Sequence, residues 1–186
     1  AKIKSIDISE AEALPGVLAI ETGQQHTDVF GVLPVTKDEH AMAVDKVRHV
    51  GDLVACVAAE NEAIALEALR LIKVDYEVLK PIHNMKKSLE NVDHPIHDRG
   101  KYHIGKSNVQ KRVFQEFGNF EDMKKPHASS KAKWKFAGVN HGFTEPHAVV
   151  ANWEPSGRLT LYTPQQVPHY VHRSLADVLK IPMHQI

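Results

Sequence analysis

The sequence holds a single cysteine, Cys56, among its 186 residues. One thiol cannot form an internal disulfide, which excludes the small secreted folds that depend on a disulfide framework. A chain with so little cysteine fits a reducing compartment, and we therefore expect a cytoplasmic protein. Cys56 lies within an apolar stretch, so we expect an inert core thiol there and not a nucleophile.

The chain also lacks long apolar runs and an excess of charge of either sign. No apolar run approaches the ~20 residues that a membrane-spanning helix needs, and the N-terminal residues lack the apolar stretch of a signal peptide. The 23 Lys and Arg residues balance the 23 Asp and Glu residues, so no strong field would attract nucleic acid or an anionic membrane. We therefore expect a globular chain whose partners include neither nucleic acid nor a membrane.

Histidine, in contrast, is unusually abundant, at 13 of 186 residues. His169 and His172 would share one face of a helix, a spacing that could suggest zinc. A structural zinc site needs four close ligands, usually including cysteine, and no second pair at a suitable spacing is evident. Incidental histidine patterns are common, so we expect no intrinsic metal site.

Glu145 and His147 flank a proline and could form an acid–base pair. The alternative is a buried carboxylate that anchors a turn by accepting backbone hydrogen bonds. We favour this structural role for Glu145, because the sequence places no nucleophile beside the two side chains.

Two strand–helix–strand patterns occupy the front half of the sequence. In the first, Ser9 is a candidate N-cap for a short helix over residues 10–14, and residues 17–20 form an apolar strand. In the second, residues 52–59 are typical of a strand buried on both faces, and Asn61 can cap the helix that follows.

The second helix and the strand after it have clear periods. Five apolar residues would share one helix face: Ile64, Ala65, Ala68, Leu69 and Ile72. Val74, Tyr76 and Val78 then alternate with charged residues, the pattern of a half-buried strand. Both units packed on one sheet would give a compact α/β domain over residues 1–82.

Residues 83–129 follow no sustained period, because Gly, Pro and Asn interrupt every run. Residues 109–117 are the only stretch with strand character. Nearly fifty residues without regular structure are unusual inside a compact domain. We therefore interpret this segment as an extended connector that lies along a larger partner surface.

Regular patterns return over residues 130–186. Alternation with lysines predicts a one-sided strand that carries Ala132, Trp134 and Phe136 on its apolar face. A hairpin follows, with strands at 147–153 and 158–162. Apolar residues then mark one face of a helix over residues 167–179, with Pro168 in its first turn.

Several segments share the order and spacing of motifs in one enzyme family: Ala11-Glu12-Ala13-Leu14-Pro15-Gly16-Val17, Asp45-Lys46-Val47-Arg48-His49-Val50-Gly51-Asp52, Val74-Asp75-Tyr76-Glu77, Glu145-Pro146-His147 and Gln165-Gln166-Val167-Pro168-His169-Tyr170. These segments resemble the molybdenum-binding subunit of the xanthine dehydrogenase/aldehyde oxidase family of molybdenum hydroxylases. The resemblance implies an α+β fold, with an α/β hammerhead domain followed by the first hairpin and helix of a molybdopterin-binding domain. It implies three parts: the hammerhead domain (1–82), the connector (83–129) and the truncated molybdopterin-binding part (130–186).

The resemblance gives a chemical role to one residue. Gln166 matches the family's glutamine beside the molybdenum, where its amide would donate a hydrogen bond to a metal oxo group. The adjacent Gln165 could be mistaken for it, and Pro164-Gln165 stand where the family usually has Ser-Thr. Without the resemblance, Gln166 could equally be an N-cap-like residue ahead of Pro168.

The full enzyme that the resemblance implies is an oxidoreductase with a molybdopterin-type molybdenum cofactor. Iron–sulfur clusters and FAD would lie on other chains or segments, because one cysteine cannot hold a cluster. The remainder of the subunit would be a further partner, and the full enzyme a dimer of protomers. No catalytic residue or metal ligand is expected in this fragment, which should bind no cofactor and be inactive alone.

Within the family, Tyr162 and the residues from Gln166 to His172 are most similar to the large subunit of 4-hydroxybenzoyl-CoA reductase, which removes a ring hydroxyl from an aromatic thioester. The alternative hypothesis is a stand-alone α/β binding or assembly module without catalysis. A reading frame that continues into a Gly-Gly-Phe-Gly-Gly loop favours the first hypothesis, and a native stop after Ile186 favours the second.

Overall fold

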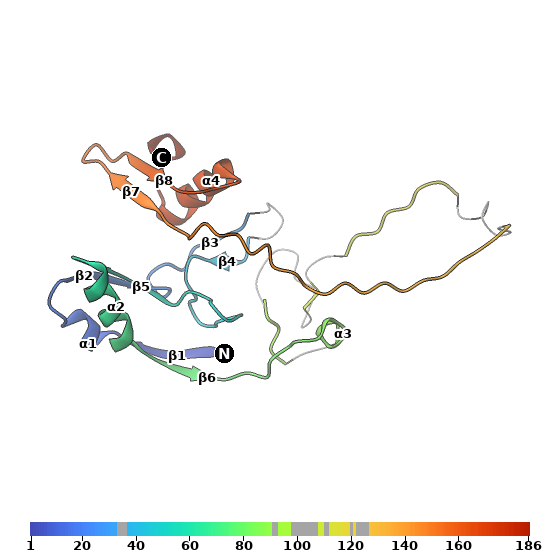
Figure 1. Cartoon of the computed structure of the whole chain (residues 1–186), viewed down its shortest axis with the longest axis horizontal. Helices are drawn as coiled ribbons and strands as arrows, with labels where there is room; N and C mark the ends of the chain where they lie inside the picture. Colours follow the sequence, from blue (N-terminus) through green and yellow to red (C-terminus); the bar gives the residue numbers. More distant parts are fainter. Residues whose placement is uncertain (33–36, 91–92, 98–107, 110–111, 120, 122–126) are drawn as a thin grey trace.

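The computed structural model describes residues 1–186 except 33–36, 91–92, 98–107, 110–111, 120 and 122–126. Figure 1 shows an N-terminal α/β unit (residues 1–80) and a C-terminal unit (residues 150–186) that lies beside it. A long extended arm, whose described residues are 112–119, 121 and 127–149, leads to the C-terminal unit. This mixture of helices and strands confirms the predicted α+β class. No helix in the described ranges is long and apolar enough to cross a membrane.

The two main sheets of the N-terminal unit are built from four strands that pair across the two predicted patterns. β1 (Lys2–Asp7) is antiparallel to β6 (Lys73–Glu77), and β2 (Val17–Thr22) is antiparallel to β5 (Ala55–Ala59). The prediction of one sheet was wrong, because each pair forms its own two-stranded sheet.

Small side chains let the two helices of this unit pack closely. Ala11 of α1 (Ser9–Glu12) and Ala68 of α2 (Glu62–Leu71) are both fully buried and join Ile20 of β2 in one core cluster. An alanine at each contact allows the helix backbones to approach without a cavity.

The caps of these helices were predicted with mixed success. Asn61 caps α2 as predicted, since its Oδ1 accepts a hydrogen bond from Ile64 N at 3.0 Å. Ser9 is not the N-cap of α1 but its first residue. Asp7 Oδ1 instead accepts from Ser9 N and Ser9 Oγ, at 3.0 and 2.7 Å, and the hydrogen bond from the Ser9 side chain lowers the pKa of Asp7.

Burial on β5 and α2 differs from the prediction. β5 is not buried on both faces, and Cys56 is exposed, so the prediction of a core thiol was wrong for this chain. The physical reason is that β5 pairs with β2 alone and α2 contacts this two-stranded sheet, which leaves alternate side chains of β5 uncovered. On α2, Leu69 is exposed, and Leu71 packs against the core instead.

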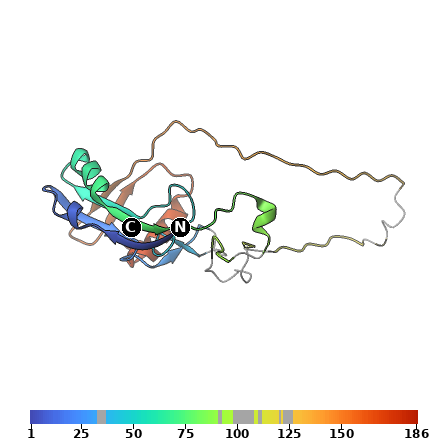
Figure 2. The same ribbon diagram turned by 90° about the horizontal axis from the view of Figure 1, so that it is seen from below.

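The arm shows a second difference. The described part of 109–117 and all of 130–136 form no strand, although both were predicted to have strand character. Trp134 and Phe136 are 81% and 88% exposed. Their segment is extended in Figures 1 and 2 but has no neighbouring strand among the described residues, so no ladder can form.

The C-terminal unit confirms the predicted hairpin and helix. β7 (Val150–Trp153) pairs antiparallel with β8 (Leu159–Tyr162), with Trp153 opposite Leu159, and β7 is shorter than predicted. Gly157, at φ +88°, closes the turn with its N–H donating to Glu154 O at 2.9 Å. α4 (Pro168–Leu179) follows, and the short 3-10 helix η2 (Met183–Gln185) ends the chain.

Three short elements complete the described structure. β3 (Val29–Phe30) and β4 (Glu39–His40) form a small antiparallel hairpin, which is called the β3–β4 hairpin below. α3 (Met85–Ser88) lies within the predicted connector and is capped by Asn84, whose Oδ1 accepts from Lys86 N at 2.9 Å. The connector therefore contains one helical turn that the sequence periodicity did not indicate.

Candidate functional site

The candidate cofactor residue lies on the loop between β8 and α4, residues 163–167, called the Gln166 loop below. Helix α4 begins at Pro168, which needs no N–H partner at this first position. Val167 occupies the N-cap position, and no side chain caps the helix. The alternative role of Gln166 as an N-cap-like residue was therefore wrong.

The two adjacent glutamines have different surroundings. Gln165 lines a hollow of about 320 Å³ between β8 and α4, together with residues such as Leu161 and Val171. Gln166 is exposed and takes part in none of the hydrogen bonds found among the described residues. Its amide therefore remains available as a donor, which fits contact with an acceptor oxygen supplied from outside this chain.

His169 and His172 both lie on α4, as predicted. His172 Nε2 lies 2.7 Å from Met183 O, and because a carbonyl only accepts, this ring nitrogen is the donor. That bond ties α4 to η2. No group of three or more His, Cys, Asp or Glu side chains that could hold a metal ion occurs within the described part of the chain.

Glu145 and His147 also have no catalytic arrangement. Both are exposed, so the prediction of a buried Glu145 carboxylate was wrong for this chain. The His147 ring instead meets Phe143 edge to face, with 5.3 Å between ring centroids.

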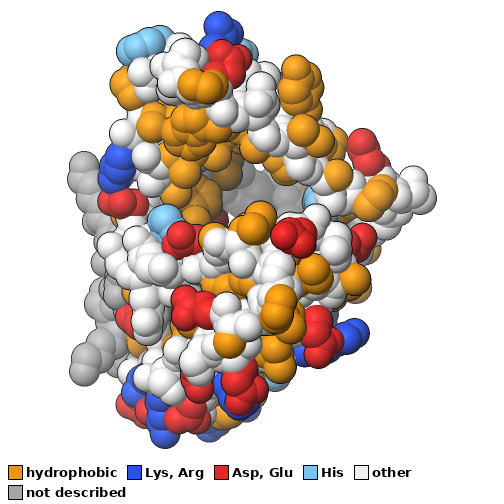
Figure 3. Space-filling model, turned by 90° about the vertical axis from the view of Figure 1, so that its left-hand side faces the viewer, with side chains coloured by type: hydrophobic (Ala, Val, Ile, Leu, Met, Phe, Trp, Pro, Cys, Tyr) orange, Lys and Arg blue, Asp and Glu red, His pale blue; other side chains and the backbone are white. Residues whose placement is uncertain are grey.

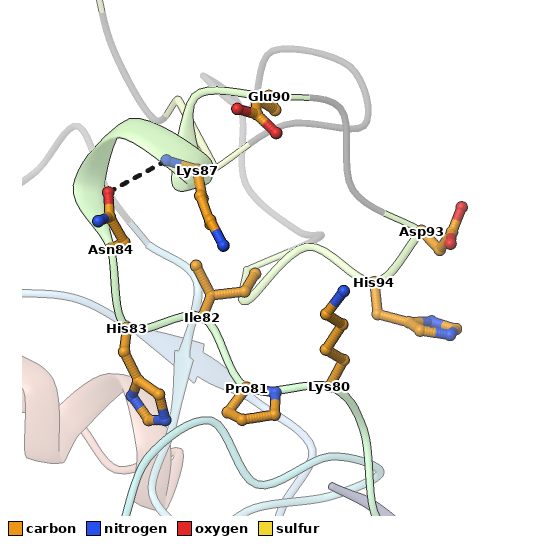
Figure 4. A pocket seen from close by; sticks show the side chains of 9 residues that line it. All are labelled: Lys80, Pro81, Ile82, His83, Asn84, Lys87, Glu90, Asp93 and His94. Carbon is orange, nitrogen blue, oxygen red and sulfur yellow. Dashed lines mark hydrogen bonds between the residues drawn. The ribbon is translucent and has the colours of Figure 1, made fainter.

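A second candidate site is the pocket beside α3, which has a volume of about 380 Å³. In Figure 4, Lys80 and Lys87 extend toward the middle of the pocket, whereas His83 and Asp93 lie at opposite ends. The two ammonium groups could attract an anion, but the lining residues include no Ser, Thr or Cys nucleophile. No lining side chain is hydrogen-bonded to another one, so the pocket holds no nucleophile paired with a base.

Comparison with known proteins connects both units to one family. Residues 1–80 match the family model described as the a/b hammerhead domain of aldehyde oxidase and xanthine dehydrogenase. Residues 103–186 match the molybdopterin cofactor-binding domain. The division of the chain at residues 82 and 129 stays a prediction.

Relatives and solved structures agree with these matches. The chain is 32% identical over 187 residues to the nicotinate dehydrogenase large molybdopterin subunit of Eubacterium barkeri, covering 98% of this chain and 41% of that subunit. It is 33% identical over 190 residues to xanthine dehydrogenase of Drosophila pseudoobscura pseudoobscura, covering 100% of this chain and 13% of the relative.

Among solved structures, quinoline 2-oxidoreductase from Pseudomonas putida 86 is 28% identical, with a TM-score of 0.78 over 100% of this chain and 24% of that one. The chain thus spans less than half of the length of each of these proteins. It belongs to the xanthine dehydrogenase/aldehyde oxidase family of molybdenum hydroxylases, and it comprises the family's hammerhead domain and the start of its molybdopterin cofactor-binding domain.

Proposed function

We propose that this chain is part of the molybdenum-binding subunit of an oxidoreductase and that it has no activity alone. One observation supports the proposal most strongly: a hammerhead domain and a cofactor-binding domain follow each other in one chain, as matches over 1–80 and 103–186. The candidate site agrees, because His172, which lines the hollow with Thr160 and Thr163, is hydrogen-bonded to Met183 O and to neither of these hydroxyl groups among the described residues.

Gln166 is the residue that would meet the cofactor. When bound, a molybdenum–pterin group supplies two-electron redox chemistry at the metal. The uncommitted amide of Gln166 would donate an N–H to an oxygen ligand of the metal and would add no charge of its own. The neighbouring Gln165 lines the hollow between β8 and α4 and is a less suitable donor.

The remainder of the molybdenum subunit is the nearest proposed partner. Large apolar side chains of the arm and the β7–β8 hairpin are exposed, among them Phe136, Trp153 and Tyr162. Figure 3 shows hydrophobic side chains gathered around a hollow below the C-terminal unit. An apolar surface of this kind is typical of a face that other protein covers.

The rest of the proposed assembly follows the family. Iron–sulfur clusters and FAD would lie on other subunits or domains, since Cys56 is the single cysteine of this sequence. The assembled enzyme would be a cytoplasmic dimer of protomers.

Two substrate classes compete for this enzyme. The run from Gln166 to His172 supports a 4-hydroxybenzoyl-CoA reductase type of reaction, the reductive dehydroxylation of an aromatic CoA thioester. Two similar proteins are named for nicotinate and quinoline, which supports oxidation of a nitrogen heteroaromatic ring instead. Assays of the assembled enzyme with both classes would separate these reactions.

Metal analysis of the assembled enzyme is the first test of the proposed function. We expect molybdenum and a pterin in the full-length subunit, and a metal-free, pterin-free product would refute the assignment. A stand-alone binding or assembly module, the alternative, predicts that second result.

The role of Gln166 is tested by Gln166→Ala in the same enzyme. Loss of one preorganised hydrogen-bond donor should lower kcat by about 10- to 100-fold at unchanged thermal stability, which is the usual effect of removing a hydrogen-bond partner of a metal ligand. Gln165→Ala is the matched control and should leave turnover within about twofold, well below that effect. Equal effects of the two substitutions would remove the assignment to Gln166.

A further inference from the structure

Helix α4 is held on two opposite faces. Its apolar face carries Val171 and Leu175, which line the hollow against β8. Arg173 and Asp177, at positions i and i+4, share the other face, and Lys180 follows directly as the C-cap residue, at φ 57°. A polar helix face of this kind is usually solvated, but here it lies against the N-terminal unit (Figure 1).

Three polar contacts join this face to the β3–β4 hairpin and the residues that flank its strands. Lys180 Nζ lies 2.7 Å from Asp28 Oδ1, just before β3. Lys37 Nζ, just before β4, donates to Asp177 Oδ2 at 2.8 Å. Arg173 Nη2, one turn before Asp177 on the helix, donates to the carbonyl oxygen of Val32 at 3.1 Å. The two salt bridges have opposite polarity: the hairpin side contributes the carboxylate of Asp28 to one and the ammonium of Lys37 to the other.

Opposite polarity makes the contact specific in register. If α4 shifted by one turn or rotated by half a turn, like charges would meet or the pairs would part. The Arg173 guanidinium also lies 5.0 Å from the centroid of the Tyr170 ring, and this contact restricts the rotamers of the Arg173 side chain that donates to Val32 O. The side chains of both salt bridges are about half exposed, so each salt bridge shifts the equilibrium between docked and undocked α4 by less than about fivefold. The salt bridges therefore fix the position of α4 more than they stabilise the fold.

We propose that the β3–β4 hairpin clamps α4 and so positions the Gln166 loop at the N-terminal end of that helix. Arg173, Asp177 and Lys180 are thus positioning residues for the cofactor side of the molecule. The link to catalysis rests on the proposed function of Gln166, but the clamp itself rests on the three contacts. The hammerhead domain thereby sets the geometry of a site in the neighbouring domain.

A charge swap in the assembled enzyme tests the clamp. Lys37→Glu and Asp177→Lys each place like charges opposite one another, and the double variant restores an opposite pair. Each single variant should raise the amide exchange of residues 163–171 about three- to fivefold, and the double variant should return it to within about twofold of the native rate. Turnover should follow the same pattern, with kcat changing more than KM.

A matched control is the pair Glu67 and Arg70 on α2, which also forms an exposed salt bridge, at 3.1 Å, but does not face α4. The swap Glu67→Arg with Arg70→Glu should leave exchange at residues 163–171 unchanged. Native exchange rates in both single variants of the clamp would overturn the proposal. Altered exchange with native kcat, together with native kcat for Gln166→Ala, would uphold the clamp and refute the role of Gln166.

Discussion

Gly23 is the position where the N-terminal unit tolerates no side chain. It follows β2 directly, and its N–H donates to Val54 O at 3.3 Å. A Cβ built at Gly23 would lie 2.1 Å from Ala43 O and 2.8 Å from Met42 O. Both atoms are backbone, so no side-chain rotation can relieve the clash, and the two chain segments must move apart.

The expected cost of Gly23→Ala is therefore at the upper end for overpacking, about 3 kcal/mol. Typical domains are stable by only about 5–15 kcal/mol, so this cost is a large share of the total. With a urea slope of about 1–3 kcal/mol per molar, the unfolding midpoint should fall by roughly 1–3 M. Trp134 and Trp153 both lie outside the N-terminal unit, so their fluorescence would report other regions. Amide exchange of β2 and β5 is the suitable probe.

Gly138→Ala is the matched control, because a Cβ there meets nothing within 4 Å and its φ is not positive. This substitution should be neutral or stabilise the chain by up to about 1 kcal/mol, through the lower entropy of the unfolded state. If Gly23→Ala and Gly138→Ala unfolded β2 and β5 at the same urea concentration, the close backbone approach at Ala43 would be refuted.

Two further predictions concern the same unit. Asn61→Ala removes the cap of α2 and should cost about 1 kcal/mol, seen as a lower thermal midpoint by circular dichroism. Asn152→Ala is the control, because Asn152 lies in β7 and caps no helix. Lys2 Nζ donates to Glu77 Oε1 at 3.1 Å, and this hydrogen bond lowers the pKa of the Glu77 carboxyl below its ordinary 4.5. The ion pair therefore adds stability that is present above pH 4.5 and is lost as the pH falls through the lower pKa of the folded state. Glu77→Gln should therefore flatten the acid limb of a profile of unfolding free energy against pH. A residual slope should remain from Asp7, whose pKa is also lowered. An unchanged acid limb would contradict this reasoning.

Local rules predicted the elements better than their pairing. Asn61 and Pro168 mark the starts of their helices by capping and by a fixed φ, which depend on neighbouring residues alone. The pairing of β1 with β6 is a contact across seventy residues, and no local pattern encodes it. Cys56 was misplaced for a related reason, because an apolar run cannot show how many strands its sheet will contain.

The candidate site shows the same division. The position of Gln166 came from a resemblance and from counting along α4, and the structure adds that its amide is uncommitted. The clamp was missed because Arg173, Asp177 and Lys180 form an ordinary polar helix face in sequence. Only the fold brings Asp28 and Lys37, more than 130 residues away, against that face. The one available signal was the alternation of charge sign along the face.

The exposed apolar side chains of the arm set what a partner would have to provide in order to fix its conformation. Fixing the backbone of one residue costs about 1–2 kcal/mol, so each two-residue repeat of a strand costs about 2–4 kcal/mol. Burying one apolar side chain per repeat, such as Trp134 or Phe136, returns about 1.5–3 kcal/mol. The two ranges overlap, so apolar contact alone leaves little surplus free energy to order the segment, and backbone hydrogen bonds would add to it. A strand edge placed along residues 130–136 would pair the N–H and C=O groups of the arm, which a flat apolar surface would leave to water.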